Sequence, residues 1–199
     1  ETKSGLIAFI GLDGNITTTD QTGGQVTQLT VDAGSRDGVR RWYTGPAWSA
    51  RARQLSFIKF DQLSDGTIYS SVLTTDRGSL KPRVIWESSE LSPIYLYWSP
   101  DGKWISLLSQ RAGSEPRFEL GIIDPAGKLS YKPMDTGLPL YWAWDPENRF
   151  MLAHVDGGTN SGGRLTLLNI KGETKKRNFN VRPTRFQSPA VSPDGERML

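Results

Sequence analysis

The 199-residue sequence contains no cysteine and a single histidine. Without thiols the chain cannot form disulfides or use thiolate chemistry, although this absence does not identify a compartment. A hydrolytic zinc site normally uses several His, Cys or carboxylate ligands, and one imidazole cannot supply them. We therefore predict no metal site and no cofactor.

Long apolar runs and helical periodicity are also missing. No stretch approaches the roughly 18 consecutive apolar residues that a membrane-spanning helix needs, so we expect no transmembrane segment. No signal peptide is visible, as would also hold for a processed exported protein. Apolar residues alternate with a period of two, which predicts strands throughout.

Charge of one sign is not in large excess, because the formal net charge is +3. Basic residues concentrate in the run 171–185, where Glu173 is the one acidic residue. Such a cluster can bind nucleic acid, but most aromatic residues lie in other parts of the chain. We interpret the run as a solvated outer strand and expect no nucleic-acid partner.

One short phrase recurs four times, at intervals of about 46–50 residues. An aromatic or branched residue is followed by a small polar residue, a tight turn and a hydrophobic strand. The four copies are residues 48–52, 98–102, 144–148 and 191–195. A regular period in this range indicates one supersecondary unit that buries its hydrophobic face against its neighbours.

Within each repeat, turn residues separate four short strands. In the third repeat the strand after the turn is apolar on both faces, with Ile105 and Leu107 on one and Trp104 and Leu108 on the other. Such a strand lies in a sheet covered on both sides. Four antiparallel strands per about 40–50 residues are typical of a propeller blade. The sequence therefore predicts an all-β fold, a β-propeller of four-stranded antiparallel blades. The predicted blades are residues 5–34, 43–90, 94–135 and 139–181, with a partial repeat at 186–199.

The phrase Pro46-Ala47-Trp48-Ser49 and the Ser-Pro-Asp-Gly turns at 99–102 and 192–195 resemble the TolB-type propeller repeat. That repeat occurs in the periplasmic protein TolB, in propellers of the prolyl oligopeptidase family and in oligogalacturonate lyases. The resemblance covers nearly the whole chain and implies a periplasmic or extracellular protein. Propellers host many unrelated activities, so it is specific for fold and unspecific for function. The turns at 49–52 and 145–148 lack Pro-Asp-Gly, and we expect their shapes to differ.

The first predicted blade lacks a first strand, and the last segment supplies a first strand and the start of a second. Either residues 188–192 complete the first blade and close a ring of four, or the chain is part of a larger propeller. Residues 196–199 align with residues 103–106 and so duplicate the strand 6–10, which favours the larger propeller. Open blade ends would then favour self-association.

Catalytic and metal-binding candidates are few. His154 aligns with core positions of other blades, and no Gly-x-Ser-x-Gly elbow accompanies it. Asp13-Gly14-Asn15 and the oxygen-rich run 156–160 do not fit a calcium-loop spacing, and Asp-Gly is itself a hairpin signal. We interpret His154 as a core residue and both oxygen-rich segments as turns, with no catalytic residue in the chain.

Aromatic and basic residues precede each innermost strand, and we expect these connections to gather on one face around a central channel. Aromatic side chains with a polar tip anchor protein interfaces, and arginines could bind a carboxylate there. Packing inside the channel is an equally good interpretation. The candidate binding residues are Arg40, Arg41, Trp42, Tyr43, Tyr95, Tyr97, Tyr141, Trp142 and Arg185.

Three functions fit these features. The first is a non-catalytic propeller that binds a protein or peptide through the channel face. The second is the propeller of a prolyl-oligopeptidase-like serine peptidase whose catalytic domain is not in this chain. The third is an oligogalacturonate-lyase-like enzyme, which by resemblance would use metal-binding histidines, so that a single histidine argues against it.

Overall fold

The computed structural model describes residues 5–51, 53–76, 81–113, 117–128, 131–156, 163–172, 176–181, 183 and 186–199. In these ranges the chain forms strands without helices, and hence no helix long enough to cross a membrane. The strands are β1 (Leu6–Ile10), β2 (Ile16–Asp20), β3 (Thr27–Gln28), β4 (Gly34–Arg36), β5 (Val39–Trp48), β6 (Gln54–Gln62), β7 (Ile68–Asp76), β8 (Arg83–Ser88), β9 (Leu91–Trp98), β10 (Ile105–Arg111), β11 (Phe118–Ile123), β12 (Lys132–Gly137), β13 (Leu140–Trp144), β14 (Phe150–Val155), β15 (Arg164–Asn169) and β16 (Lys176–Asn178).

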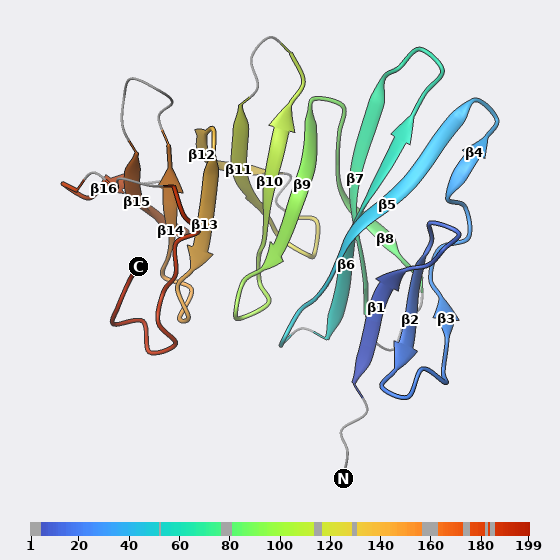
Figure 1. The fold of residues 1–199 in the computed structure, drawn as a ribbon, viewed down its shortest axis with the longest axis horizontal. Helices are drawn as coiled ribbons and strands as arrows, with labels where there is room; N and C mark the ends of the chain where they lie inside the picture. The colour runs from blue at the N-terminus through green and yellow to red at the C-terminus, as the bar shows by residue number, and fades with distance from the viewer. Residues whose placement is uncertain are drawn as a thin grey trace.

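The strands form four antiparallel sheets, which we call A to D (Figure 1). Sheet A is β1-β2-β3 and sheet B is β4-β5-β6-β7-β8. Sheets C (β9 to β12) and D (β13 to β16) have four strands each. Sheets B, C and D stand side by side, and sheet A packs against sheet B (Figure 1). The prediction of antiparallel propeller blades is confirmed.

The four phrases form the same hairpin register. In each, the backbone N–H of the small polar residue donates to the carbonyl five residues later, from Ser49 to Gln54 and from Ser192 to Arg197 among others, at 2.8–3.1 Å. The turn at 145–148 keeps this shape because Asn148 adopts φ 58°, where Gly102 has φ 72°. The expectation of a different shape is therefore wrong for that turn. In the turn at 49–53 the left-handed residue is Arg53, one position later.

The hydrophobic core consists of three clusters, each between two neighbouring sheets. Ile16 and Phe57 lie between sheets A and B, and Ile58 faces the other way, between B and C. Alternate faces of β10 also enter different clusters: Ile105 and Leu107 pack toward sheet B, and Leu108 packs toward sheet D, with Trp104 beside it. This confirms the prediction that the strand is covered on both faces.

The innermost strand of sheet B begins earlier than predicted. We expected it near Gly45 with a connection before it, but β5 already starts at Val39 and pairs with β4. The reversal between them is Asp37-Gly38, with φ 51° and 78°, a two-residue turn of the type that suits a right-handed hairpin. Gly45, at φ 62°, lies at the irregularity between the two halves of β5.

The two ends of the sheet row do not meet among the residues that the structure describes. Residues 190–199 form a small hairpin of their own, with a bridge between Val191 and Met198. This hairpin lies near sheet D, and β1 lies at the opposite end of the row (Figure 1). Pairing of residues 190–192 with β1 inside one molecule is thus not observed.

Candidate functional site

The predicted channel-face residues that the structure describes lie in strands, which corrects the expectation of a connection for residues 40–43 and agrees with the predicted blades for the other four. They separate into two groups. Residues 40–43 belong to β5, and the other group belongs to the innermost strands β9 and β13 of the next two blades. Arg185 lies outside the described residues.

The second group forms a chain of ring contacts between sheets C and D. Tyr95 and Tyr97 lie two residues apart on β9, with ring centroids 6.3 Å apart. Tyr95 is 6.0 Å from Tyr141, and Tyr97 meets Trp142 edge to face at 5.4 Å. Tyr95 is 40% exposed and Tyr97 is 48% exposed, because Leu96 between them turns into the core toward sheet B.

Phe186 extends this surface and was not among the predicted residues. Its ring lies 5.5 Å from Tyr141 and 4.9 Å from His154. The signal in the sequence was its place just ahead of the fourth phrase, where the other repeats also carry aromatic residues. We call Tyr95, Tyr97, Tyr141 and Phe186 the tyrosine cluster. A hydrogen bond with Tyr95 and partial burial raise the pKa of the Tyr141 hydroxyl above its usual value.

Trp142 is buried, and its ring packs against Tyr97 of the tyrosine cluster. Its indole N–H and that of Trp144 both donate to the Ser106 hydroxyl, each at 3.0 Å. Ser106 in turn donates to the Tyr97 carbonyl at 3.0 Å. One buried hydroxyl therefore connects β9, β10 and β13 and fixes the strands that carry the tyrosines.

The β5 group is engaged within the chain. Arg41 contacts Asp61 through Nε at 2.5 Å and Nη2 at 3.1 Å, and it also pairs with Asp32. The Tyr43 hydroxyl donates to Asp32 at 2.6 Å. Burial alone would raise the pKa of Asp61, but hydrogen bonds from Arg41 and Lys59 outweigh it and lower this pKa below its usual range. Arg41 is thus committed to two internal carboxylates, and the prediction that it receives a ligand carboxylate loses its main support.

Arg40 and Trp42 point to the other side of β5. The Arg40 guanidinium carbon lies 5.8 Å from the Trp42 ring centroid, and Trp42 stacks on Phe60 at 5.0 Å. Trp42 therefore packs against the core between sheets B and C. Arg40 remains exposed and forms no ion pair among the residues that the structure describes.

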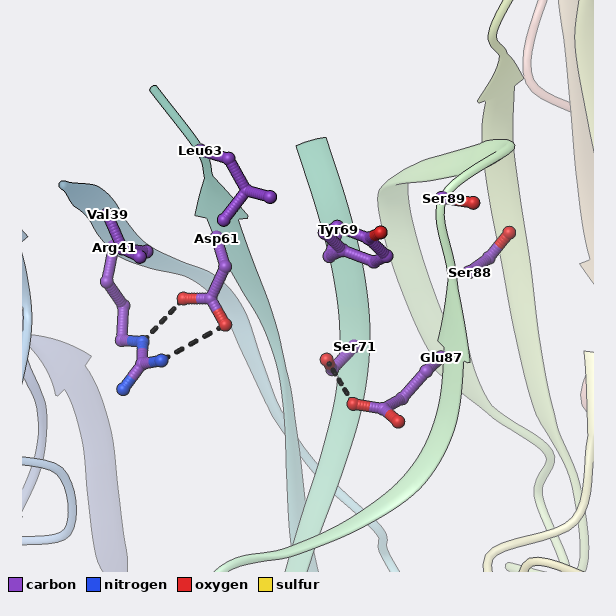
Figure 2. Close-up of a pocket in the computed structure, with 9 residues that line it drawn as sticks. All are labelled: Val39, Arg41, Asp61, Leu63, Tyr69, Ser71, Glu87, Ser88 and Ser89. Carbon is purple, nitrogen blue, oxygen red and sulfur yellow. Dashed lines mark hydrogen bonds and ion pairs between the residues drawn. The ribbon is translucent and has the colours of Figure 1, made fainter. Parts of the chain in front are cut away.

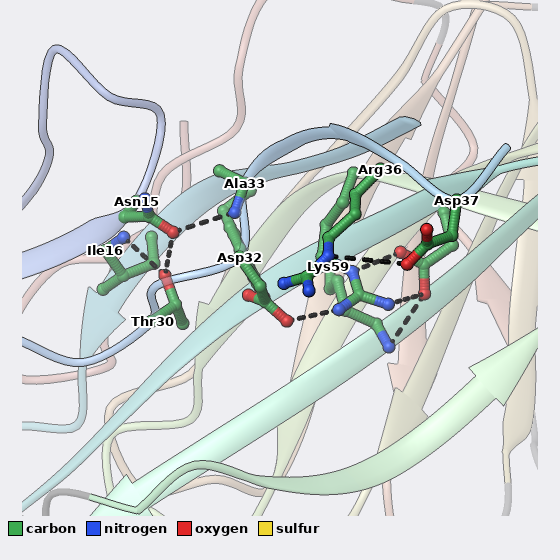
Figure 3. A network of polar contacts seen from close by, with 11 residues as sticks. Asn15, Ile16, Thr30, Asp32, Ala33, Arg36, Asp37 and Lys59 are labelled. Atoms are coloured by element: carbon green, nitrogen blue, oxygen red, sulfur yellow. Dashed lines mark hydrogen bonds and ion pairs between the residues drawn. The ribbon is translucent and has the colours of Figure 1, made fainter. Parts of the chain in front are cut away.

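A hydrogen-bond network positions Asp32 for its contacts (Figure 3). The Asn15 side-chain oxygen accepts from Thr30 Oγ1 at 3.1 Å and from the Ala33 N–H at 3.0 Å. Thr30 Oγ1 also accepts from the Ile16 N–H at 2.9 Å. The connection from sheet A to sheet B is held at both sides of Asp32, so the carboxylate reaches Arg41 and Tyr43.

A pocket of ≈ 440 Å³ opens beside this network on sheet B (Figure 2). Arg41, Asp61 and Tyr69 are cross-strand neighbours in it, and Ser71 donates to Glu87 at 3.2 Å on the far side. Sequence reasoning missed this pocket because its residues come from four strands with no common motif. Its lining residues are Val39, Arg41, Asp61, Leu63, Tyr69, Ser71, Glu87, Ser88 and Ser89.

The structure places the remaining sequence candidates as follows. His154 is 4% exposed, and its Nδ1 lies 2.8 Å from the Gln187 carbonyl oxygen. Asp13 accepts hydrogen bonds from the N–H and the side-chain amide of Asn15, which closes the turn around Gly14. Of the run 156–160, all but Asp156 falls outside the described ranges. In those ranges no three His, Asp or Glu residues are grouped as metal ligands.

No protein-family model matches the chain, and no curated protein sequence matches it. Solved structures do match. An oligogalacturonate lyase of Vibrio parahaemolyticus shares 12% identity at a TM-score of 0.66, over 97% of this chain and 54% of that one. A puromycin-hydrolysing peptidase of Mycobacterium tuberculosis shares 14% identity at a TM-score of 0.67, over 98% and 33%. The β-propeller domain of the trilobed protease of Pyrococcus furiosus shares 15% identity at a TM-score of 0.55, over 79% and 47%.

These likenesses show the fold, which is that of a β-propeller. The chain spans between a third and about half of the length of these three proteins. One of the three is a lyase and two are peptidases, so the shared fold does not define an activity.

Proposed function

We propose that this chain is a non-catalytic, TolB-like propeller that binds an extended segment of a protein or peptide on the tyrosine cluster. The observation that supports it best is the exposure of Tyr95 and Tyr97 on a rigid base. Aromatic side chains with polar tips give large contact area at low cost in conformational entropy, and they dominate the binding energy of many interfaces. The Ser-Pro-Asp-Gly turns support the TolB-type resemblance and with it a periplasmic or extracellular location.

The cluster suits an uncharged or apolar peptide stretch. Its rings come from two neighbouring blades and form one continuous surface that carries no charged group of its own. Arg40, which is exposed on β5, could bind an acidic residue of the ligand.

Phage display of random peptides on the immobilised chain tests this proposal. We expect selected peptides to bind with micromolar dissociation constants, and Tyr97→Ala to weaken that binding at least tenfold, as for an aromatic interface anchor. Tyr69→Ala is the matched control, because Tyr69 is 46% exposed but lies in the sheet B pocket. If Tyr69→Ala weakens binding and Tyr97→Ala does not, the sheet B pocket is the site and the proposal is wrong.

A second candidate is the propeller domain of a serine peptidase with a separate catalytic domain. The similarity to the mycobacterial peptidase and to the trilobed protease propeller favours it. The tyrosine cluster would then contact peptide substrates on their way to the catalytic domain. Sequencing the gene beyond codon 199 separates the two, because a Gly-x-Ser-x-Gly segment would indicate the peptidase.

The lyase has less support. Its metal-binding histidines would need accessible imidazoles, whereas His154 is buried against Phe186 and the Gln187 backbone.

A further inference from the structure

Sheet A differs from its neighbours at its inner edge. In sheets C and D the strand after the turn, β10 or β14, has a partner on both sides. Its counterpart β1 pairs with β2 alone among the described residues, and Ile7 and Phe9 on it are 51% and 38% exposed. An apolar strand with unpaired backbone groups is a template for another strand.

A buried hydrogen-bond donor faces this edge. In the next blade, Trp98 Nε1 donates to the Ala47 carbonyl on the innermost strand of the preceding blade, at 3.1 Å. The equivalent Trp48 Nε1 is buried and has no acceptor in the part of the chain that the structure describes. A buried N–H without a partner costs about 1–3 kcal/mol, so Trp48 indicates where an acceptor belongs.

A cavity borders Trp48 and the start of β1. It has a volume of ≈ 350 Å³ and is bounded by the start of β1, the Trp48 ring and the turn after β5. Its lining residues are Gly5, Leu6, Trp48, Ser49, Ala50 and Arg53.

We propose that residues 188–192 of a second copy of this chain fill the cavity, pair with β1 and bring the Ala190 carbonyl to Trp48 Nε1. The sequence Pro189-Ala190-Val191-Ser192 repeats Pro46-Ala47-Trp48-Ser49, whose Ala47 carbonyl is the acceptor for Trp98. The register repeats as well. Ser192 donates to Arg197 as Ser49 donates to Gln54, so the segment has the conformation of an innermost strand.

The segment is available for exchange. In the described part of the chain its backbone pairs with residues 197–199 alone, of which Leu199 is 89% exposed. Pairing with the five-residue β1 replaces that short pairing with a longer one that also satisfies Trp48. Because the segment and β1 lie at opposite ends of the row (Figure 1), the contact is head to tail. Such contacts produce rings or open chains of copies.

Sedimentation velocity of the chain over a range of concentrations tests the proposal. We expect concentration-dependent species larger than the monomer. Trp48→Phe removes the donor and keeps a ring, and we expect it to weaken association about tenfold, the effect of one buried hydrogen bond. Trp98→Phe is the control, because its donor is satisfied within the chain, and we expect unchanged association. Circular dichroism confirms that both variants are folded.

A synthetic peptide of residues 186–194 provides a second readout. We expect it to dissociate the larger species, and an ester in place of the Ala190–Val191 amide to weaken it, because an ester carbonyl is a poorer acceptor. A monomer at every concentration would overturn the proposal, even if the peptide binds. An equal weakening of association in Trp48→Phe and Trp98→Phe would overturn the assignment of Trp48 Nε1 as the donor. Neither result bears on Tyr95, Tyr97 and Tyr141 of the tyrosine cluster, which lie on other strands.

Discussion

The Ser106 hydroxyl makes three hydrogen bonds, two of which connect neighbouring blades. It accepts from Trp142 and Trp144 and donates to the Tyr97 carbonyl. We predict that Ser106→Ala lowers the free energy of unfolding by about 1–3 kcal/mol, because two indole N–H groups lose their acceptor in a buried site. Urea denaturation followed by tryptophan fluorescence measures the change.

Ser109→Ala is the matched control on the same strand. Ser109 is also fully buried, but its hydroxyl has no hydrogen-bond partner in the described part of the chain. The same deletion should therefore cost little or stabilise the protein slightly. Equal losses for the two variants would show that the loss of buried volume, and not the hydrogen-bond network, determines the effect.

Asp135 is a buried carboxylate with two cationic partners. Arg164 Nη1 lies at 2.7 Å and Lys176 Nζ at 2.8 Å. Burial alone would raise the pKa of Asp135, but these hydrogen bonds outweigh it and the pKa is lowered. The contribution of the carboxylate to stability is therefore complete above the unfolded-state pKa of about 3.9 and is lost as the pH falls through the lower folded-state pKa.

We predict that Asp135→Asn lowers the free energy of unfolding by about 2–3 kcal/mol at pH 7, because both partners are only partly exposed and lose a charged acceptor. The difference from the unmodified chain should shrink as the pH falls from about 4 to 2. Urea titrations at pH 7, 4 and 2.5 measure it. Asp37→Asn, in an exposed ion pair, should change stability by less than about 0.5 kcal/mol. A loss for Asp135→Asn that is the same at all three pH values would contradict the argument.

The sequence predicted the positions of the aromatic residues in the candidate site better than those of the polar partners. The repeat places Tyr95 and Tyr141 on equivalent positions, each three residues before the Trp of its phrase. The partners of Arg41 are Asp32, in the connection between two blades, and Asp61, on the next strand. No local pattern predicts such pairs, because they depend on how the blades meet.

At the scale of elements, the turn after each innermost strand is the most regular feature of the chain. Asn148 takes the left-handed conformation that glycine takes elsewhere. We predict that Asn148→Ala lowers the free energy of unfolding by about 1 kcal/mol, because a Cβ without a polar group is strained there. Asn148→Gly should be near neutral, although it removes the same 3.4 Å contact with the Asp101 N–H. Thermal denaturation distinguishes them, and equal losses would assign the effect to that contact.

β4 and the first half of β5 were missed although a signal was present. Asp37-Gly38 is a strong two-residue hairpin sequence. The arginines and aromatic residues after it favoured a connection over a strand. A strand at this place depends on the ion pairs that Arg41 forms within the chain, and no local sequence pattern predicts those pairs. Gly45 and Pro46 also interrupt the alternation, at the point where the pairing with β6 shifts.

At the scale of the molecule, the described residues form three cores that lie in series between four sheets. Such stacks need not unfold as one unit. We predict that Ile16→Ala, in the core between sheets A and B, speeds amide hydrogen exchange in those two sheets and leaves sheet D unchanged. Leu168→Ala, between sheets C and D, should give the reverse pattern. Uniform acceleration everywhere in both variants would show a single cooperative unit.

The fold class could be predicted from the sequence because the same phrase, with its turn and strand, occurs four times at one period. The number of strands in sheet B could not, since this sheet gains β4 from a connection, whereas the three strands of sheet A agree with the prediction that the first blade lacks a first strand. The extra strand lies where one blade gives way to the next, outside the repeated phrase.

The serial arrangement also has a mechanical consequence. A load applied between β1 and the C-terminal hairpin passes through every blade interface in turn, since these elements lie at the two ends of the row (Figure 1). Two indole hydrogen bonds to Ser106 stabilise the interface between sheets C and D. The indole hydrogen bond from Trp98 to the Ala47 carbonyl stabilises the interface between sheets B and C. At the interface between sheets A and B, the Trp48 indole N–H has no such hydrogen bond among the described residues. Under tension, sheet A should therefore detach before the other sheets.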